Sequence, residues 1–231
     1  MFYWDSTYIL VIIGFAISIL ASAMVDSAMS KYHKVNNSTG ITGAECARRI
    51  LDNEGLYHVQ VEELDSSNGD HYDPSANAVR LSHRNYHGRT VTAMGVAAHE
   101  CGHAIQHAQD YAPMRIRMAL VPVVNFGSRA SMPLIFLGII LSWNFVLIRL
   151  GIIAFSLTVI FQLATLPVEF NASSRALERL ERYGIVTQQE NNGCRKILRA
   201  AAMTYVAGVL ASALQLLRLV LLFGGGRRRD D

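Results

Sequence analysis

Apolar residues are gathered in three long runs along this chain, and a polar stretch separates the first run from the second. The first run, residues 6–25, holds no charged side chain and is long enough to cross a bilayer as a helix of about 30 Å. The second run, residues 118–168, is interrupted only by Arg129 and Arg149 and has room for two crossings joined by a turn at residues 142–144. The pattern predicts a mostly α-helical integral-membrane protein.

The third apolar run, residues 200–223, carries one internal charge, at Arg218, and is long enough for a fourth crossing. A helix that lies on the membrane surface is the alternative for this run. For the first run, a secretory signal peptide is the competing interpretation. It fits poorly, because Asp5 rather than a lysine or an arginine precedes the run. We therefore expect an uncleaved anchor at the N-terminal end.

The polar stretch, residues 36–115, has the features of a small folded domain. Thr42 and Glu45 have the spacing of a capping box, in which each residue's side chain bonds the other's backbone N–H at the start of a helix. Gly55 is the expected stop. A short amphipathic helix is predicted between these signals.

Two short strands and a longer helix follow within the same domain. Alternation of apolar and polar residues predicts strands at residues 57–64 and 78–81, joined by a loop that covers residues 66–74. The longer helix is expected from about residue 90 to residue 110. The domain is therefore expected to be a small α+β structure built around this helix.

The longer helix carries the most informative motif of the chain, because residues 99–103 read His-Glu-Cys-Gly-His, the pattern HExxH. Residues four apart lie on one face of a helix with Cβ atoms about 6 Å apart, so His99 and His103 can bind one Zn²⁺. Glu100 lies about 100° further round the helix, where it can take a proton from a water molecule at the metal. The motif predicts a zinc-dependent hydrolase with one Zn²⁺ per chain.

A catalytic zinc ion usually has three protein ligands and an open position for water, so one further ligand is needed. Gln106 and Gln109 occupy the places where the longer signature HExxHxxGxxH requires glycine and histidine, which excludes that class. His107 lies about 6 Å beyond His103 on the same helix, too far to complete the site. Glu169 ends the second apolar run, which returns the chain to the membrane face where it began. We expect Glu169 to be the third ligand, with a glutamate that merely ends a span as the alternative.

Composition agrees with a membrane protein. The chain has 231 residues, of which 51% are hydrophobic and 17% charged, and no nucleic-acid partner is expected.

The three cysteines, Cys46, Cys101 and Cys194, are odd in number and have no close spacing, so they predict neither a disulfide framework nor a structural zinc site. On a regular helix Cys101 faces away from the two motif histidines, and we expect it to be a small buried side chain.

Basic residues indicate the orientation of the chain in the membrane. None precedes the first span, whereas several follow it between Lys31 and Arg49, so the positive-inside rule places the N-terminus outside and the domain in the cytosol. Residues 169–199, a predicted helical segment that begins with Glu169, are also rich in arginine and are expected on the cytosolic side. The basic tail at residues 227–229 disagrees, because a fourth crossing would place it outside.

Four segments taken together resemble those of a known family. They are Ala97–His107, Asp70–Pro74, Tyr111–Pro113 and Glu169–Ser173. In this combination the chain, over residues 5–223, resembles the bacterial family of neutral zinc metallopeptidases anchored in the membrane. It is more distantly similar to HtpX-type heat-shock proteases and to prenyl-protein proteases, whose third ligand is the glutamate of a Glu-x-x-x-Asp pattern on a later helix.

The resemblance implies a zinc site of the gluzincin type, in which His99, His103 and Glu169 hold the metal and Glu100 is the base. It also implies the fold class, an integral-membrane helical protein with a small α+β zincin-like cytosolic domain, residues 36–115, around the HExxH helix.

Other roles in the site are open at this point. Ser173 stands where the distant relatives have the aspartate that orients a ligand histidine, and Asn171 and Asp70 are candidates to replace it. A peptidase also needs a donor for the developing oxyanion. Arg175, one or two turns beyond Glu169, and His71, in its loop, are the candidate catalytic residues for that purpose. The alternative for His71 is a purely structural role, as a cap at the end of a strand.

These features predict a membrane-embedded zinc endopeptidase that acts at the cytosolic surface of the bacterial inner membrane. Its expected partners are the lipid bilayer and protein or peptide substrates, membrane proteins among them. The alternative is a zinc-stabilised scaffold or chaperone-like binder that cleaves nothing. Glu100 argues against this alternative, because a purely structural zinc site needs no base and normally has four protein ligands. The sequence does not predict whether subunits associate.

Overall fold

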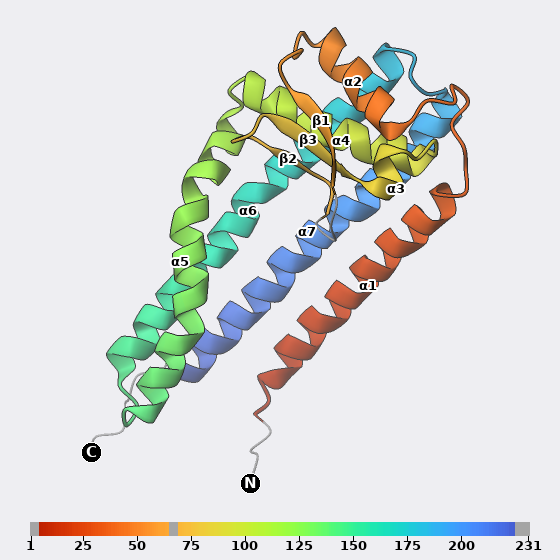
Figure 1. Cartoon of the computed structure of the whole chain (residues 1–231). Coiled ribbons are helices and arrows are strands. Elements are labelled where there is room, and N and C mark those ends of the chain that lie inside the picture. Colours follow the sequence, from red (N-terminus) through yellow and green to blue (C-terminus); the bar gives the residue numbers. More distant parts are fainter. Residues whose placement is uncertain (1–4, 65–68, 225–231) are drawn as a thin grey trace. The chain divides into compact units, whose positions relative to one another are not determined.

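The computed structural model describes residues 5–64 and 69–224, and this part of the chain is mostly helical (Figure 1). Its helices are α1 (Tyr8–Tyr32), α2 (Gly43–Asn53), α3 (His83–Tyr86), α4 (Val91–Ala108), α5 (Ala112–Ile140), α6 (Phe145–Arg182) and α7 (Gln188–Phe223). Its strands are β1 (Gln60–Leu64), β2 (His71–Asp73) and β3 (Ala78–Ser82).

The chain forms two compact units. The helical unit consists of Met1–Ala21, Ile116–Leu166 and Thr204–Asp231, and the sheet unit consists of Ser22–Arg115 and Pro167–Met203. The helices α1, α5, α6 and α7 each contribute residues to both units. All three strands lie in the sheet unit, together with α2, α3 and α4.

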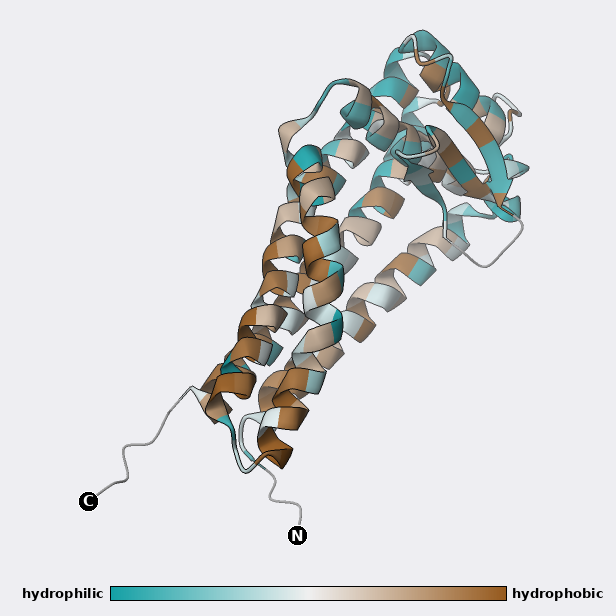
Figure 2. Ribbon diagram, turned by 60° about the vertical axis from the view of Figure 1, so that its left-hand side comes forward, coloured by the Kyte–Doolittle hydropathy of each residue, from teal (hydrophilic) through white to brown (hydrophobic). Residues whose placement is uncertain are grey.

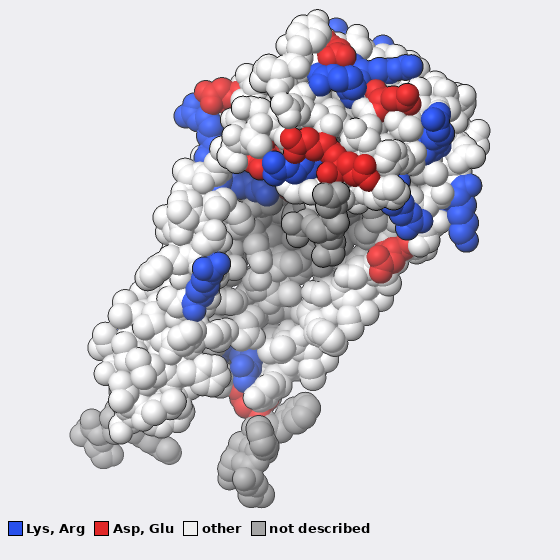
Figure 3. All heavy atoms as spheres, viewed as in Figure 1, with Lys and Arg blue, Asp and Glu red and all other residues white. Residues whose placement is uncertain are grey.

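Four of the described helices, α1, α5, α6 and α7, are long and apolar enough to cross a membrane. Figure 2 shows that hydrophobic residues dominate the parts of these helices that belong to the helical unit. On the face drawn in Figure 3, that unit shows few charged side chains, whereas the sheet unit shows many. The prediction of a mostly α-helical membrane protein is therefore confirmed, while the basic tail at residues 227–229 lies outside the described residues.

The turn between α5 and α6 lies where the sequence predicts it. Ser142 and Trp143 have φ values of 54° and 62°, which reverse the chain direction within a few residues. The side chain of Asn144 then accepts hydrogen bonds from the backbone N–H groups of Val146 and Leu147, at 3.1 and 3.3 Å, and so caps α6. α5 therefore ends just before this turn, at Ile140, and α6 begins just after it, at Phe145.

Small residues let the two hairpin helices approach closely. A Cβ atom on Gly151 would lie 2.7 Å from the carbonyl oxygen of Ser131, and one on Gly138 would lie 2.7 Å from Ile148 Cγ1. Close backbone approach of this kind is typical of helices packed in a bilayer, where lipid offers no hydrophobic incentive for helices to associate.

The sheet has three strands rather than the predicted two, in the order β1-β3-β2. β1 pairs with β3 in parallel, and β2 pairs with β3 in antiparallel orientation. The prediction of a loop over residues 66–74 was therefore wrong at residues 71–73, and residues 65–68 are outside the described part. A strand of three residues is too short to show a period of two, and β2 forms only because β3 offers an edge to pair with.

The start of the sheet unit follows its capping signals. Thr42 Oγ1 accepts a hydrogen bond from the Glu45 backbone at 3.2 Å and Glu45 Oε2 accepts one from the Thr42 backbone at 2.7 Å, which is the predicted capping box. Gly55, with φ +74°, follows the end of α2. Thr90 caps α4, since its side chain accepts from the Ala93 backbone.

α2 and α4 pack against each other and form the centre of the core. The apolar residues of these two helices that are almost completely buried are Cys46, Ala47, Ile50, Leu51, Val91, Ala93, Met94, Ala97, Ala98, Cys101, Ala104 and Ile105. Small side chains are frequent on α4, so neighbouring backbones can come close to it. The sheet covers the core with Val79 and Leu81 of β3, which are fully buried.

The last two helices divide the chain differently from the prediction. Glu169 does not begin a separate polar helix, because α6 runs without interruption through Pro167 to Arg182. The break comes at residues 183–187, where Gly184 has φ +60°. α7 begins at residue 188, so one helix contains the last part of the predicted segment 169–199 together with the predicted segment 200–223. A change from apolar to polar side chains marks a change of surroundings and need not end a helix.

α4 and α6 come into direct contact at Gly102. A Cβ atom at this position would lie 2.5 Å from the carbonyl oxygen of Ala172, which is shorter than side chains tolerate. Ala172 is itself fully buried. The glycine in the middle of HExxH is therefore required for the close approach of these two helices.

Gly102→Ala should destabilise the protein by about 1–3 kcal/mol, because the added methyl group forces α4 and α6 apart. Thermal unfolding of the purified protein in detergent measures this loss. The matched control is Gly95→Ala on the same helix, whose new Cβ would meet Cys194 at an ordinary 3.4 Å. Equal unfolding temperatures for the two variants would contradict the proposed role of Gly102.

Candidate metal centre

α4 presents both motif histidines and the motif glutamate within one turn of helix. The rings of His99 and His103 lie 4.7 Å apart between centroids, in an edge-to-face arrangement. His103 and Glu100 are buried, each 7% exposed, and His99 is partly exposed. The regular helix thus delivers the side-by-side arrangement that the spacing predicts.

α6 places Glu169 against this pair. Glu169 Oε2 lies 3.3 Å from His99 Nε2 and 3.6 Å from His103 Nε2, and the residue is only 2% exposed. One donor atom from each side chain lies within 4.8 Å of the donor atoms of the other two. The structure therefore brings together the three side chains that the sequence analysis selected as ligands.

Gln106 fixes the ring of His103. Its Nε2 donates to the Val168 carbonyl at 2.8 Å and to Asn171 Oδ1 at 2.9 Å, so its Oε1 is the atom that accepts from His103 Nδ1, at 3.0 Å. The proton of the ring is then on Nδ1, and the lone pair of Nε2 faces Glu169. Gln106 is fully buried, so this orientation is held by the interior of the protein.

Ser173 contacts the other histidine. Its Oγ lies 3.2 Å from His99 Nδ1, at hydrogen-bonding distance, one helical turn after Glu169. The serine can therefore orient the His99 ring from the α6 side. Asn171 reaches His103 only through Gln106, and Asp70 is bound elsewhere, to Ser82 and Asn85, so its suggested place in the site was wrong.

The electrostatics around His103 favour a cation. Burial lowers the pKa of the His103 ring, but its contact with the Glu169 carboxylate and the charges of Glu100 and Glu169 outweigh burial, so the pKa is raised. Two imidazole nitrogens and one carboxylate oxygen form a donor set that Zn²⁺ prefers. The residues present therefore fit a zinc ion.

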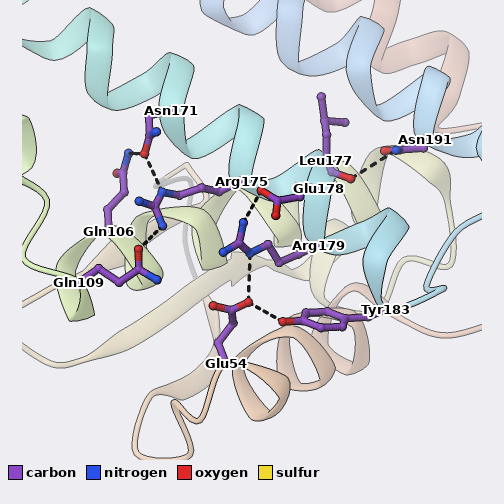
Figure 4. A network of polar contacts seen from close by, with 10 residues as sticks. All are labelled: Glu54, Gln106, Gln109, Asn171, Arg175, Leu177, Glu178, Arg179, Tyr183 and Asn191. Carbon is purple, nitrogen blue, oxygen red and sulfur yellow. Dashed lines mark hydrogen bonds and ion pairs between the residues drawn. The ribbon is translucent and has the colours of Figure 1, made fainter.

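Arg175 does not contact the three donors but is linked to them by hydrogen bonds. Its Nε donates to Asn171 Oδ1 at 2.7 Å and its Nη1 donates to Gln109 Oε1 at 2.6 Å, and Figure 4 shows both contacts beside Gln106. Its guanidinium also lies over the ring of Tyr111, 5.7 Å from the centroid. The oxyanion role predicted for Arg175 stays a prediction.

Two further histidines lie outside this group of donors. His71 is the first residue of β2, and its Nδ1 lies 2.9 Å from the carbonyl oxygen of Gly69, so its predicted catalytic role stays a prediction too. His107 Nδ1 lies 2.8 Å from the hydroxyl of Tyr72, within hydrogen-bonding distance.

Cys101 is turned away from the donors, as expected. It is fully buried, and its Sγ lies 3.6 Å from the carbonyl oxygen of Ala47 on α2. Burial raises the pKa of this thiol well above its ordinary value, which disfavours the thiolate that metal binding or nucleophilic attack requires.

A second network in Figure 4 fixes the end of α6 to the end of α2. Glu54 Oε1 accepts hydrogen bonds from Arg179 Nε, at 3.0 Å, and from the hydroxyl of Tyr183. Arg179 and Glu54 are largely shielded from solvent, with side chains 11% and 12% exposed. The helix that carries Glu169 is therefore held against the domain on both sides of the site.

Gln106 is a site residue that was not predicted from the sequence, where it served only to exclude a longer signature. A signal was available, because residue 106 lies three positions after His103 and so shares its helix face. Its two acceptors, Val168 and Asn171, lie more than 60 residues away in the sequence and become neighbours only in the folded chain.

Comparisons with known proteins point to one family. Residues 7–224 match the profile of the family described as "Putative neutral zinc metallopeptidase". The chain is 50% identical over 218 residues to "Putative membrane protease YugP" of Bacillus subtilis (strain 168), an alignment that covers 94% of this chain and 96% of the relative. No solved structure matches.

The family match and the four long apolar helices define the class, a zinc metallopeptidase associated with the membrane. The chain belongs to the neutral zinc metallopeptidase family, as its resemblance in sequence implied.

Gln106→Leu should weaken zinc binding about 10- to 100-fold, because it removes the acceptor for His103 Nδ1 and leaves the buried Val168 carbonyl without its donor. Competition with a chelator of known affinity measures the change, and circular dichroism verifies that the variant is folded. Gln109→Leu is the matched control, since Gln109 is exposed and contacts only Arg175 among these residues. Zinc affinity equal to wild type in both variants would contradict the orienting role.

Proposed function

We propose that this protein is a zinc-dependent endopeptidase of the gluzincin type. His99, His103 and Glu169 hold one catalytic Zn²⁺, and Glu100 is the general base. The observation that carries the proposal is the convergence of two Nε2 atoms and one carboxylate oxygen beside a buried glutamate. Membership of a zinc metallopeptidase family supports it.

Each part of the site has a defined task in this proposal. Zinc held by these side chains would polarise a substrate carbonyl and lower the pKa of a water molecule to about 7. Glu100 would accept a proton from the attacking water as the C–O bond forms, and would pass that proton to the amine nitrogen as the C–N bond breaks. Gln106 and Ser173 hold the two rings so that their Nε2 atoms stay directed at the metal.

Access to the centre is uneven among the three donors. The side chain of His99 is 16% exposed, against 9% for His103 and 3% for Glu169. A substrate carbonyl therefore approaches on the side of His99. Glu169 and His103 close the inner side of the site and keep water away from it.

The proposed location of this reaction is the cytosolic surface of the bacterial inner membrane. The basic residues after the first span support this orientation, and two crossings by α5 and α6 would return the chain to the cytosolic side before Glu169. The proposed substrates are proteins and peptides that reach the membrane surface, including membrane proteins.

Glu100→Gln should lower peptidase activity about 10²- to 10⁴-fold while zinc binding is retained, because only the base is removed. Cleavage of casein and self-cleavage measure activity, and elemental analysis measures zinc. Asp110→Asn, which alters an exposed carboxylate on the segment after α4, is the control and should behave as wild type. Equal cleavage by Glu100→Gln and wild type would reject Glu100 as the base, and no cleavage by zinc-loaded wild type would favour a non-proteolytic zinc-stabilised scaffold.

Glu169→Ala accompanies this experiment. It should lose zinc together with activity, which separates the loss of a ligand from the loss of the base. Zinc affinity that is unchanged in Glu169→Ala would reject Glu169 as the third ligand.

Cysteine labelling tests the orientation. All three native cysteines are buried, so a cysteine introduced at an exposed position is the accessible thiol. In intact spheroplasts, a membrane-impermeant maleimide should label Ser142→Cys, in the exposed turn between α5 and α6, but not Ala76→Cys, which is exposed in the sheet unit. Permeabilised spheroplasts should show labelling of both. The reverse pattern in intact spheroplasts would place the metal centre outside the cytosol.

A further inference from the structure

Glu63, His83 and His87 form a second group of metal-binding side chains in the sheet unit. Glu63 lies on β1, His83 begins α3, and His87 caps the C-terminal end of α3. One donor atom from each residue lies within 4.8 Å of the donor atoms of the other two. None of these residues belongs to the centre formed by His99, His103 and Glu169.

The geometry of this group is suited to a single ion. One oxygen of the Glu63 carboxylate contacts His83 Nδ1, and the other lies 3.0 Å from His87 Nε2. The two rings lie one helical turn apart, tilted by 57° with centroids 4.8 Å from each other, and the backbone N–H of His87 donates to the His83 carbonyl. Two histidines four residues apart with a carboxylate between them repeat the spacing logic of the HExxH helix.

The group is open to solvent. The side chains of His83, His87 and Glu63 are 80%, 54% and 33% exposed. An ion can therefore enter without any opening of the fold, and water can fill its remaining coordination positions.

The chemistry of the donors selects the kind of ion. Imidazole nitrogens suit Zn²⁺, Cu²⁺ and Ni²⁺, whereas Mg²⁺ and Ca²⁺ prefer sites made of oxygen ligands. Without an ion, the same contacts are surface ion pairs of histidine and glutamate, which contribute at most about 1 kcal/mol. A bound transition metal would join the three side chains far more strongly.

The site lies where such a link has a mechanical effect. β1 is an edge strand whose residue Glu63 is in register with Leu81 of β3, and α3 follows directly on β3. α3 in turn packs on α4, the helix that carries HExxH. An ion on Glu63, His83 and His87 would tie the end of the edge strand to the segment that leads into α4.

We propose that Glu63, His83 and His87 form a second, solvent-accessible site for a divalent transition metal, zinc in the first place, that braces β1 against α3. This site is additional to the catalytic zinc and does not depend on peptidase activity.

Metal content of four full-length proteins in detergent tests the proposal. Wild type, His87→Ala, His99→Asn and His58→Ala are dialysed against buffered micromolar free Zn²⁺ and analysed for bound zinc. His58 is an exposed histidine outside both groups and serves as the control. We expect about two ions per chain in wild type and in His58→Ala, and about one in each of the other two variants. Titration should show the outer site weakened about tenfold or more in His87→Ala, since loss of a ligand costs at least as much as loss of its orienting partner.

Thermal unfolding supplies the second measurement. In the His99→Asn background, zinc should raise the unfolding temperature, and adding His87→Ala should abolish that rise. Equal zinc content in wild type and His87→Ala, or an equal rise with and without His87, would overturn the second site. Zinc lost from His87→Ala but unchanged in His99→Asn would support the second site while rejecting the catalytic centre, so the two proposals fail separately.

Discussion

The close contact between α4 and α6 is the constraint on which the rest of the site depends. Gly102 lies between the two histidines of α4 and presses on the backbone of Ala172, which lies between Glu169 and Ser173 on α6. With any side chain at position 102 the helices would separate, and the Glu169 carboxylate could not stay 3.3 Å from His99. The glycine of the motif is therefore a packing residue, and the donors on either side of it are positioned by backbone contact.

Such close packing would be unfavourable if the buried polar groups were left unsatisfied. Glu100, Gln106 and Glu169 are nearly or fully removed from solvent in a unit whose core is otherwise apolar. Gln106 resolves part of this cost, because it bonds His103, Val168 and Asn171 with its single amide group. The two carboxylates are best stabilised by positive charge, and the raised pKa of His103 shows that its surroundings also favour a positive charge. A divalent cation held by the three donors would supply that charge.

The parts of this arrangement that follow from local sequence could be predicted. HExxH places two donors on one helix face, the capping box starts α2, and apolar run lengths give the hairpin and its turn at Ser142. The parts that depend on distant neighbours could not. β2 exists only as a partner of β3, and the acceptors of Gln106 lie on α6. A rule that treats a change of polarity as a helix boundary does not predict that α6 continues past Pro167.

Pro167 also separates the site from the membrane-spanning part of its own helix. It has no N–H to donate to the carbonyl group four residues earlier, and the boundary between the two compact units falls at this residue. Glu169, Ser173 and Arg175 follow it, so every donor and every residue that orients a donor belongs to the sheet unit. The geometry of the metal centre is therefore set within one unit, by α4 and the last turns of α6.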